Sequence, residues 1–138
     1  LTKGMKKQSI KSLKKKLWVI FSLYIRQRDG LRTTGSKDWI LCITCGRRYH
    51  FKLMQAGHFI SGRHNANLFS EKGTHAQCYN CNINLKGNTL EYRRRIIELY
   101  GEGYDLVLEK ENRKTLKFTA PMLLEMIETY KTKLKHLN

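Results

Sequence analysis

All four cysteines of the chain fall in two Cys-x-x-Cys pairs, Cys42 with Cys45 and Cys78 with Cys81. Two thiolates separated by two residues can hold one metal ion from a tight turn, and two such pairs complete a tetrahedral zinc site. The regular pairing argues against four unrelated buried thiols, because free cysteines in a core usually occur singly. Four thiolate ligands leave no open coordination position, so we expect a structural zinc and look elsewhere for catalytic residues.

The segment between the two pairs, residues 46–77, is longer than the roughly 15–20 residues found in many zinc ribbons. The extra length is enough for a hairpin, with two short strands expected at 55–60 and 73–77 and the polar loop 61–72 between them. A helix is expected to begin near Asn82, directly after the second cysteine pair. The pattern therefore predicts a hairpin and a helix held together by one metal ion.

His58, on the first of these strands, is the candidate for any catalytic role, since the closed zinc site can only hold such a residue in place. Taken alone, a histidine on a half-buried strand is more often structural, and a base role requires the right geometry. Asn82 is either a metal ligand or a helix cap. His75, on the second strand, shares a face with Gly73 and is expected to serve as a ligand or as a brace.

The N-terminal part is expected to form a basic arm followed by one amphipathic helix. Apolar residues recur at helical spacing between Ser9 and Asp29, and Gly30 is the expected end of the helix, with a loop at 31–38. Three consecutive lysines lie on the opposite face of this helix: Lys14, Lys15 and Lys16. They form either a solvated face or direct contacts with phosphate groups.

The middle of the chain carries weaker signals. A short strand is expected from Trp39 to Cys42, and the stretch 49–53 is expected to be irregular or extended. The helix after the second cysteine pair is expected to break near Gly87 and to end at Gly101, because glycine interrupts and terminates helices.

The C-terminal part is expected to add at least one helix. Residues 104–117 suit either a strand or a short helix, whereas Thr119 as N-cap and Pro121 in the first turn predict the start of a final helix. We expect the outer helices to pack on the zinc-centred core or on a second subunit. The second alternative would make the protein a homodimer.

The charge balance restricts the class of partner. The 138 residues include 27 Lys and Arg against 11 Asp and Glu, which gives a net charge of +16. This imbalance predicts a polyanionic partner, with nucleic acid first and an acidic membrane surface second. No apolar run reaches the roughly 18 residues of a membrane span. No signal peptide is expected, because the basic start lacks a small-residue cleavage site, and the first residue, Leu1, suggests a trimmed or incomplete start.

The order of these motifs resembles that of the phage NinG/Rap recombination proteins, over residues 13–101 and more weakly through the tail. The residues that carry the resemblance are Leu17-Trp18, Tyr24-Ile-Arg-Gln-Arg-Asp29, Cys42-Ile-Thr-Cys45-Gly46, Gln55-Ala-Gly-His58-Phe59, His75-Ala-Gln-Cys78-Tyr-Asn-Cys81-Asn82, Lys86-Gly-Asn88 and Glu91-Tyr92.

The resemblance implies an α+β fold in which a zinc-stapled HNH core (ββα-metal, treble-clef-like) is flanked by N- and C-terminal helices. It implies a basic arm and helix at 1–37, a zinc-binding nuclease core at 38–101 and a helical extension at 102–138. The implied activity is metal-dependent phosphodiester hydrolysis by a structure-specific DNA endonuclease. Its expected substrates are branched recombination intermediates, such as D-loops and four-way (Holliday) junctions, in the cytoplasm of the bacterial host.

Carried over by position, His58 is the catalytic residue that activates water, with Asn82 and His75 as further catalytic candidates. Asn82 is also expected to bind a catalytic Mg²⁺ or Mn²⁺, while the four cysteines hold the structural Zn²⁺. Nucleic-acid contacts are expected from a set of basic residues: Lys14, Lys15, Lys16, Arg26, Arg28, Arg63, His64, Lys86, Arg93 and Arg94.

Two positions depart from the family pattern. Gly57 stands where HNH proteins often place an acidic or histidine ligand, and Gly73 replaces an expected asparagine. Residues 38–90 contain only two acids, Asp38 and Glu71, whereas Mg²⁺ prefers oxygen ligands. These departures leave the identity of the catalytic ion and the level of activity open.

Two alternatives need no catalysis. One is a zinc-dependent nucleic-acid-binding module, which uses the cysteines and the charge but gives no role to His58. The other is a basic assembly protein whose outer helices bind a protein partner. Binding to DNA predicts a steep dependence on salt, whereas binding to a protein partner predicts little.

Overall fold

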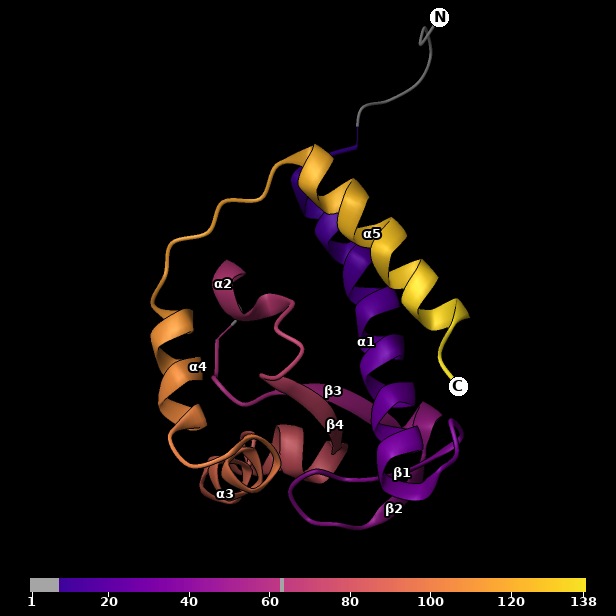
Figure 1. The fold of residues 1–138 in the computed structure, drawn as a ribbon, viewed down its shortest axis with the longest axis vertical. Helices are drawn as coiled ribbons and strands as arrows, with labels where there is room; N and C mark the ends of the chain where they lie inside the picture. Colours follow the sequence, from indigo (N-terminus) through magenta and orange to yellow (C-terminus); the bar gives the residue numbers. More distant parts are fainter. Residues whose placement is uncertain (1–7, 63) are drawn as a thin grey trace, which may run out of the picture.

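The computed structural model describes residues 8–62 and 64–138 and has an α+β architecture (Figure 1). The basic arm at 1–7 and Arg63 lie outside the described residues. A central hairpin of β3 (Met54–His58) and β4 (Thr74–Cys78) lies between the long helix α1 (Ile10–Thr34) and α3 (Thr89–Tyr100). The expected α+β class is therefore confirmed, whereas the three expected segments stay a prediction.

Helix α1 is longer than the sequence predicts. Ser9 caps its start by accepting a hydrogen bond from the Ser12 N–H, but the helix passes through Gly30 and ends at Gly35, whose φ of 76° suits a glycine. Gly30 is buried, and a Cβ there would overlap the carbonyl oxygen of Ser36. The expected stop at Gly30 is wrong because this glycine permits close packing inside the helix rather than ending it.

Helix α5 (Ala120–Lys135) begins as predicted. The Thr119 side chain accepts a hydrogen bond from the Met122 N–H, and a proline stands in the first turn. The helix runs beside α1 (Figure 1), and the two bury a shared apolar cluster that includes Phe21 and Ile127. The last helix is thus part of the main core.

The strands form two separate antiparallel pairs. β1 (Trp39–Leu41) confirms the expected strand and pairs with β2 (Arg48–His50), which lies partly in the stretch expected to be irregular or extended. A 3-10 turn, η1 (Phe51–Leu53), leads into β3. Within the hairpin Gly57 pairs with His75 and His58 with Thr74, so His58 and His75 face opposite sides of it.

The segments after β4 are helical. The π-turn η2 (Asn80–Asn84) carries Asn82 and is separated from α3 by three residues with positive φ (86–88), which confirms the expected break. The short helix α2 (Asn65–Leu68) lies within the loop expected at 61–72, and α4 (Tyr104–Asn112) shows that the ambiguous tail is a helix.

The hairpin region contributes to three apolar clusters. Ala56 packs with α1 and α5, Met54 and Ala76 pack with the cysteines, and Phe59 packs with α3 and α4. Across the described ranges, no helix is long and apolar enough to span a membrane. The hairpin is therefore fixed from several sides, and with it the end of β3 that carries His58.

Replacing Gly30 by alanine is expected to lower the free energy of unfolding by about 1–3 kcal/mol, because the added methyl group overpacks a buried contact. Urea unfolding measures this change. Val19→Ala, on the exposed face of the same helix, is the control and should stay within about 0.5 kcal/mol of the wild type. A stabilised G30A protein would contradict the close packing at this position.

Candidate functional site

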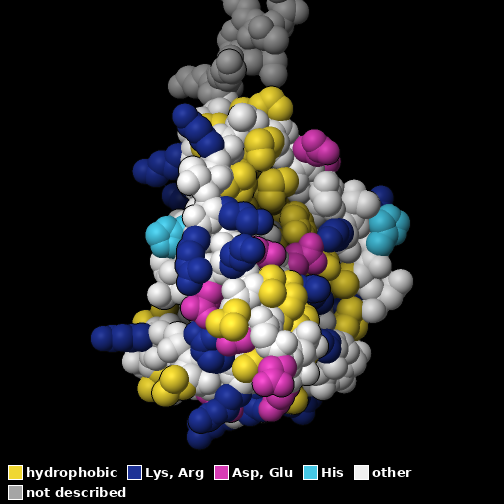
Figure 2. Space-filling model, turned by 60° about the vertical axis from the view of Figure 1, so that its left-hand side comes forward, with side chains coloured by type: hydrophobic (Ala, Val, Ile, Leu, Met, Phe, Trp, Pro, Cys, Tyr) yellow, Lys and Arg dark blue, Asp and Glu magenta, His cyan; other side chains and the backbone are white. Residues whose placement is uncertain are grey.

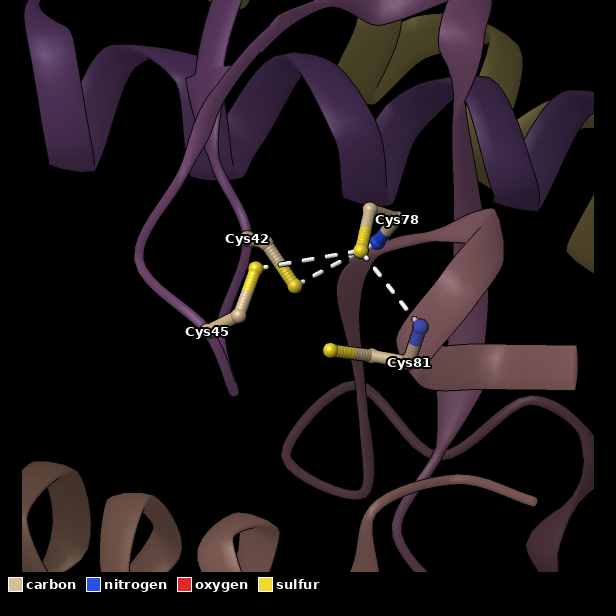
Figure 3. Close-up of side chains that lie close together, drawn as sticks. All are labelled: Cys42, Cys45, Cys78 and Cys81. Atoms are coloured by element: carbon tan, nitrogen blue, oxygen red, sulfur yellow. Dashed lines mark hydrogen bonds between the residues drawn. The ribbon is translucent and has the colours of Figure 1, made fainter. Parts of the chain in front are cut away.

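The four cysteines converge as a potential metal centre. Their sulfur atoms lie within 4.8 Å of one another, and all four side chains point toward a common centre (Figure 3). The Sγ atoms of Cys45 and Cys78 are 3.8 Å apart, which matches the roughly 3.8 Å separation that a tetrahedral site with Zn–S bonds of about 2.3 Å requires. The cysteines are therefore close enough to hold a structural metal such as zinc.

Backbone amides direct the sulfurs inward. The Cys78 N–H donates to the Cys42 sulfur at 3.3 Å, and the Cys81 N–H donates to the Cys78 sulfur at 3.4 Å. The first pair sits on a tight turn, in which the N–H of Gly46 donates to the Cys42 carbonyl and the glycine φ is 74°. N–H donors stabilise negatively charged sulfur, so the local backbone suits thiolate ligands.

The charges of the cluster also require a cation. Burial and the nearby Cys42 sulfur raise the pKa of Cys45 to about 12. Burial opposes ionisation of Cys42 too, but N–H groups and the Thr44 hydroxyl outweigh it and lower its pKa to about 7. Four thiolates at this separation would repel one another strongly, and a bound Zn²⁺ removes that repulsion. The donor set therefore fits zinc.

His58 lies at the end of β3 and is held on two sides. Its Nε2 is 3.0 Å from the carbonyl oxygen of Leu68, and its ring stacks on Trp18 with centroids 5.2 Å apart and planes 24° apart. A carbonyl oxygen can only accept, so Nε2 carries the proton and Nδ1 is the basic nitrogen of the neutral ring. This orientation suits a general base.

Three adjoining hollows lie on this part of the surface, one of them lined by His58, and we call them together the basic groove. The first holds about 260 Å³ beside His58. The second, about 470 Å³, shares Asn82 with the first, and the third, about 430 Å³, shares Trp18 with the second. Cationic side chains line all three: Lys86 in the first, Arg26 and Lys52 in the second, and Lys11, Lys14 and Lys15 in the third. The groove thus presents positive charge around the candidate base.

Asn82 reaches the groove from η2, and its orientation is set by β3. Its Nδ2 donates to Gln55 Oε1 at 2.6 Å, which directs Oδ1 toward Gly57. A Cβ on Gly57 would overlap Gln77 Oε1 and would lie 3.1 Å from Asn82 Oδ1. This packing explains the glycine before His58, since an acidic or histidine side chain has no space there.

The groove offers few ligands for a catalytic divalent ion. No Asp or Glu is among the residues that line its three hollows, and Asn82 supplies the side-chain amide of the hollow that His58 lines. Mg²⁺ and Mn²⁺ prefer several oxygen ligands, usually including a carboxylate. The described side chains therefore do not by themselves fit an Mg²⁺ or Mn²⁺ site.

His75 is fully buried on the opposite face of the hairpin from His58. Its Nδ1 lies 3.1 Å from the hydroxyl of Tyr92 and its Nε2 lies 2.7 Å from the hydroxyl of Tyr100, while Tyr92 donates to the Gly57 carbonyl. Burial lowers the pKa of His75 to about 3. The structure therefore does not bring His75 to the groove, and the brace is the role that its contacts favour.

Some of the predicted nucleic-acid-binding residues line the basic groove, and others are exposed elsewhere on the surface. Lys14, Arg26 and Lys86 line the basic groove as Lys15 does, whereas Lys16 is exposed on α1 and His64 is exposed at the start of α2. Arg63 lies outside the described residues.

The other predicted arginines are engaged within the protein. Arg28 donates to the carbonyls of Glu71 and Thr74, and Arg93 pairs with Asp105. Arg94 is exposed and pairs with Glu91. Figure 2, turned to bring the side of α4 forward, shows Lys and Arg side chains interspersed with acidic ones on this face. These arginines are largely compensated, so the structure favours the groove as the anionic-ligand surface.

Sequence reasoning missed the groove contacts of several residues. Trp18 carried no expected role at the site, yet it stacks on His58 and lines two hollows. Lys52 and Gln55 carried no expected role at the groove. A tryptophan that interrupts a lysine-rich helix face was the available signal, but its partner lies 40 residues away in sequence.

Removal of the metal is expected to cost more than about 5 kcal/mol of stability, comparable with the whole free energy of unfolding of a small domain. Elemental analysis should find zinc in a one-to-one ratio with the chain, and a chelator should lower the melting temperature sharply. Zn²⁺ should restore it, whereas Mg²⁺ should not, because thiolates bind hard cations poorly. Cys78→Ser should behave like the chelated protein; full stability of C78S without metal would contradict the site.

Acid is expected to destabilise the protein partly through His75. Because its pKa is about 3 in the folded protein and about 6.5 when unfolded, the unfolded chain binds an extra proton below pH 6.5. Stability should therefore fall by about 2 kcal/mol between about pH 7 and pH 5. Urea unfolding of His75→Gln over this range should show a flatter pH dependence; equal slopes would show that His75 is not the group responsible. Both proteins keep all four cysteines, so acid loss of metal affects them alike.

The comparison with protein-family models assigns the chain to a family. The model described as "Bacteriophage Lambda NinG protein" matches residues 2–138, so the chain belongs to this family. No curated protein and no solved structure matches it.

Proposed function

We propose that this member of the bacteriophage lambda NinG family is a structure-specific DNA endonuclease that cleaves branched intermediates of phage recombination. The observation that carries the proposal is the setting of His58. Its ring is fixed with Nδ1 as the basic nitrogen, and it lies in a groove lined by cations and beside the amide of Asn82. A buried structural histidine would have neither the adjoining hollow nor the surrounding positive charge.

The proposed reaction is hydrolysis of a phosphodiester. A water molecule transfers a proton to Nδ1 of His58 while its oxygen attacks phosphorus, and the bond from phosphorus to one sugar oxygen breaks. The leaving oxygen takes a proton from solvent. Lys86, exposed in the same hollow, is placed to stabilise charge on the phosphate.

A divalent ion, when bound, would stabilise negative charge on the phosphate and on the leaving oxygen. The described residues supply little more than Asn82 Oδ1 for it, so no step above depends on it. The expected requirement for Mg²⁺ or Mn²⁺ is therefore a question for the cleavage assay.

The metal centre would serve this site by holding its residues in place. Cys78 ends β4 and Cys81 lies within η2, one residue before Asn82. A zinc ion bound to both would lock η2 against the hairpin, and with it the distance between Asn82 and His58. This arrangement of hairpin, metal and following helix is the reason to propose an HNH (ββα-metal, treble-clef-like) nuclease core.

The groove favours binding by charge and shape rather than by base sequence. Its cations are Lys and Arg side chains that suit phosphate groups, and phosphate contacts carry no direct sequence information. The first and second hollows share Asn82 and the second and third share Trp18, so the groove offers positive charge along a continuous path. The preference for a branched substrate is what the family resemblance implies, and the cleavage assay below tests it.

Purified protein supplied with Mg²⁺ or Mn²⁺ is expected to cleave a four-way junction or a D-loop faster than a linear duplex of equal length. His58→Ala should lower the single-turnover cleavage rate by roughly 10²–10⁴-fold, because the base is lost. Junction affinity and zinc content should be retained. The cleavage products are resolved on denaturing gels across linear, flapped and four-way DNA.

His136→Ala is the matched control, since it removes an exposed histidine at the end of α5 and should cleave like the wild type. Equal activity of wild type and H58A would refute the nuclease proposal. Salt-dependent junction binding without cleavage in either protein would instead identify a non-catalytic zinc-dependent nucleic-acid-binding module.

A further inference from the structure

Glu71 lies in the loop between α2 and β4 and collects contacts from two helices. From α5, the Tyr130 hydroxyl donates to Glu71 Oε2 at 2.8 Å and the Lys133 ammonium lies 2.7 Å from the same oxygen. From α1, the Tyr24 hydroxyl lies 3.4 Å from Oε1. Partial burial alone would raise the pKa of Glu71, but the bonds from Lys133 and Tyr130 outweigh it and lower the pKa. The carboxylate is therefore a charged anchor for α5.

The backbone of the same loop is held by α1. Arg28 donates to the carbonyl of Glu71 and to the carbonyl of Thr74, each at 2.8 Å. Its guanidinium is itself fixed by Asp29, which is 1% exposed and accepts from Arg28 Nε at 2.9 Å. Helix α1 thus holds the main chain of the loop, whereas the Glu71 side chain adds its connection to α5.

This loop carries the carbonyl that orients the candidate base. Leu68 lies three residues before Glu71, and its carbonyl oxygen accepts the Nε2–H of His58. The intervening chain is bonded internally, with the Ser70 N–H donating to the Asn67 carbonyl at 3.3 Å. Movement of Glu71 would therefore also move the Leu68 carbonyl, because the segment between them is short and constrained.

We infer that Glu71 is a positioning residue for the proposed nuclease: its ion pair with Lys133 anchors the loop so that the Leu68 carbonyl holds His58 in its base orientation. The inference deepens the proposed function and rests on it. Glu71 is not among the residues that line the basic groove, so its loss should affect the chemical step rather than DNA binding.

The test compares Glu71→Gln with Glu128→Gln, an equal change of charge at an α5 carboxylate whose only ion pair within the described part of the chain is with Lys131. E71Q should lower the single-turnover cleavage rate at saturating junction by about tenfold or more, with junction affinity and zinc content unchanged. E128Q should cleave like the wild type.

A second readout does not depend on activity. The ¹⁵N chemical shifts of the His58 ring, assigned with H58A, should show a protonated Nε2 in the wild type and a mixture of tautomers in E71Q. Lys133→Met should reproduce this spectrum, which keeps the test available if E71Q fails to fold. Wild-type rates and ring shifts in both variants would overturn the inference, as would a rate loss accompanied by unchanged ring shifts. Absence of cleavage by the wild type itself would refute the proposed function and leave the spectroscopic test of the loop intact.

Discussion

Mutual repulsion among four sulfur atoms is the constraint on which the arrangement of this protein depends. The sulfurs lie within 4.8 Å of one another, on a turn after β1, at the end of β4 and in η2. As thiolates they can share this space only with a cation between them, while the segments that carry them also meet in apolar packing around Met54 and Ala76. The position of η2, and with it that of the Asn82 side chain, is therefore set jointly by the metal ligands, by this packing and by the hydrogen bond from Asn82 to Gln55.

A second polar anchor connects α1 with the hairpin. Asp29 is buried, accepts from the Ala76 N–H at 2.7 Å and pairs with Arg28 and Arg32. A buried carboxylate is tolerated only when its oxygens are satisfied in this way. The same bonds remove Arg28 from the surface, so its basic character serves the internal structure rather than a ligand.

Sequence periodicity and spacing predicted much of this fold, because the information was local. The cysteine spacing predicted the cluster, and Thr119 with Pro121 predicted the start of α5. The errors arose where distant contacts decide. Gly30 was expected to end the helix, because its sequence context does not show that the segment around Trp39 and Ile40 packs against it.

The candidate site shows the same division between local and distant information. His58 could be singled out from its strand and motif, but its tautomer depends on Leu68, ten residues away, and its ring contact depends on α1. His75 and Arg28 had suitable chemistry in the sequence, and only their burial and internal partners separate them from the groove. Residue type identifies what a side chain can do, whereas tertiary contacts determine whether a ligand can reach it.

The hairpin has one further consequence. In the described ranges β3 pairs with no strand besides β4, and Arg26 and Lys52 of the groove lie beside it. An unpaired strand edge invites another chain to add to the sheet, and nearby cations oppose this because two copies of the chain repel each other. The charge that suits this edge to a polyanion therefore also protects it against self-association, and high ionic strength would weaken both effects together.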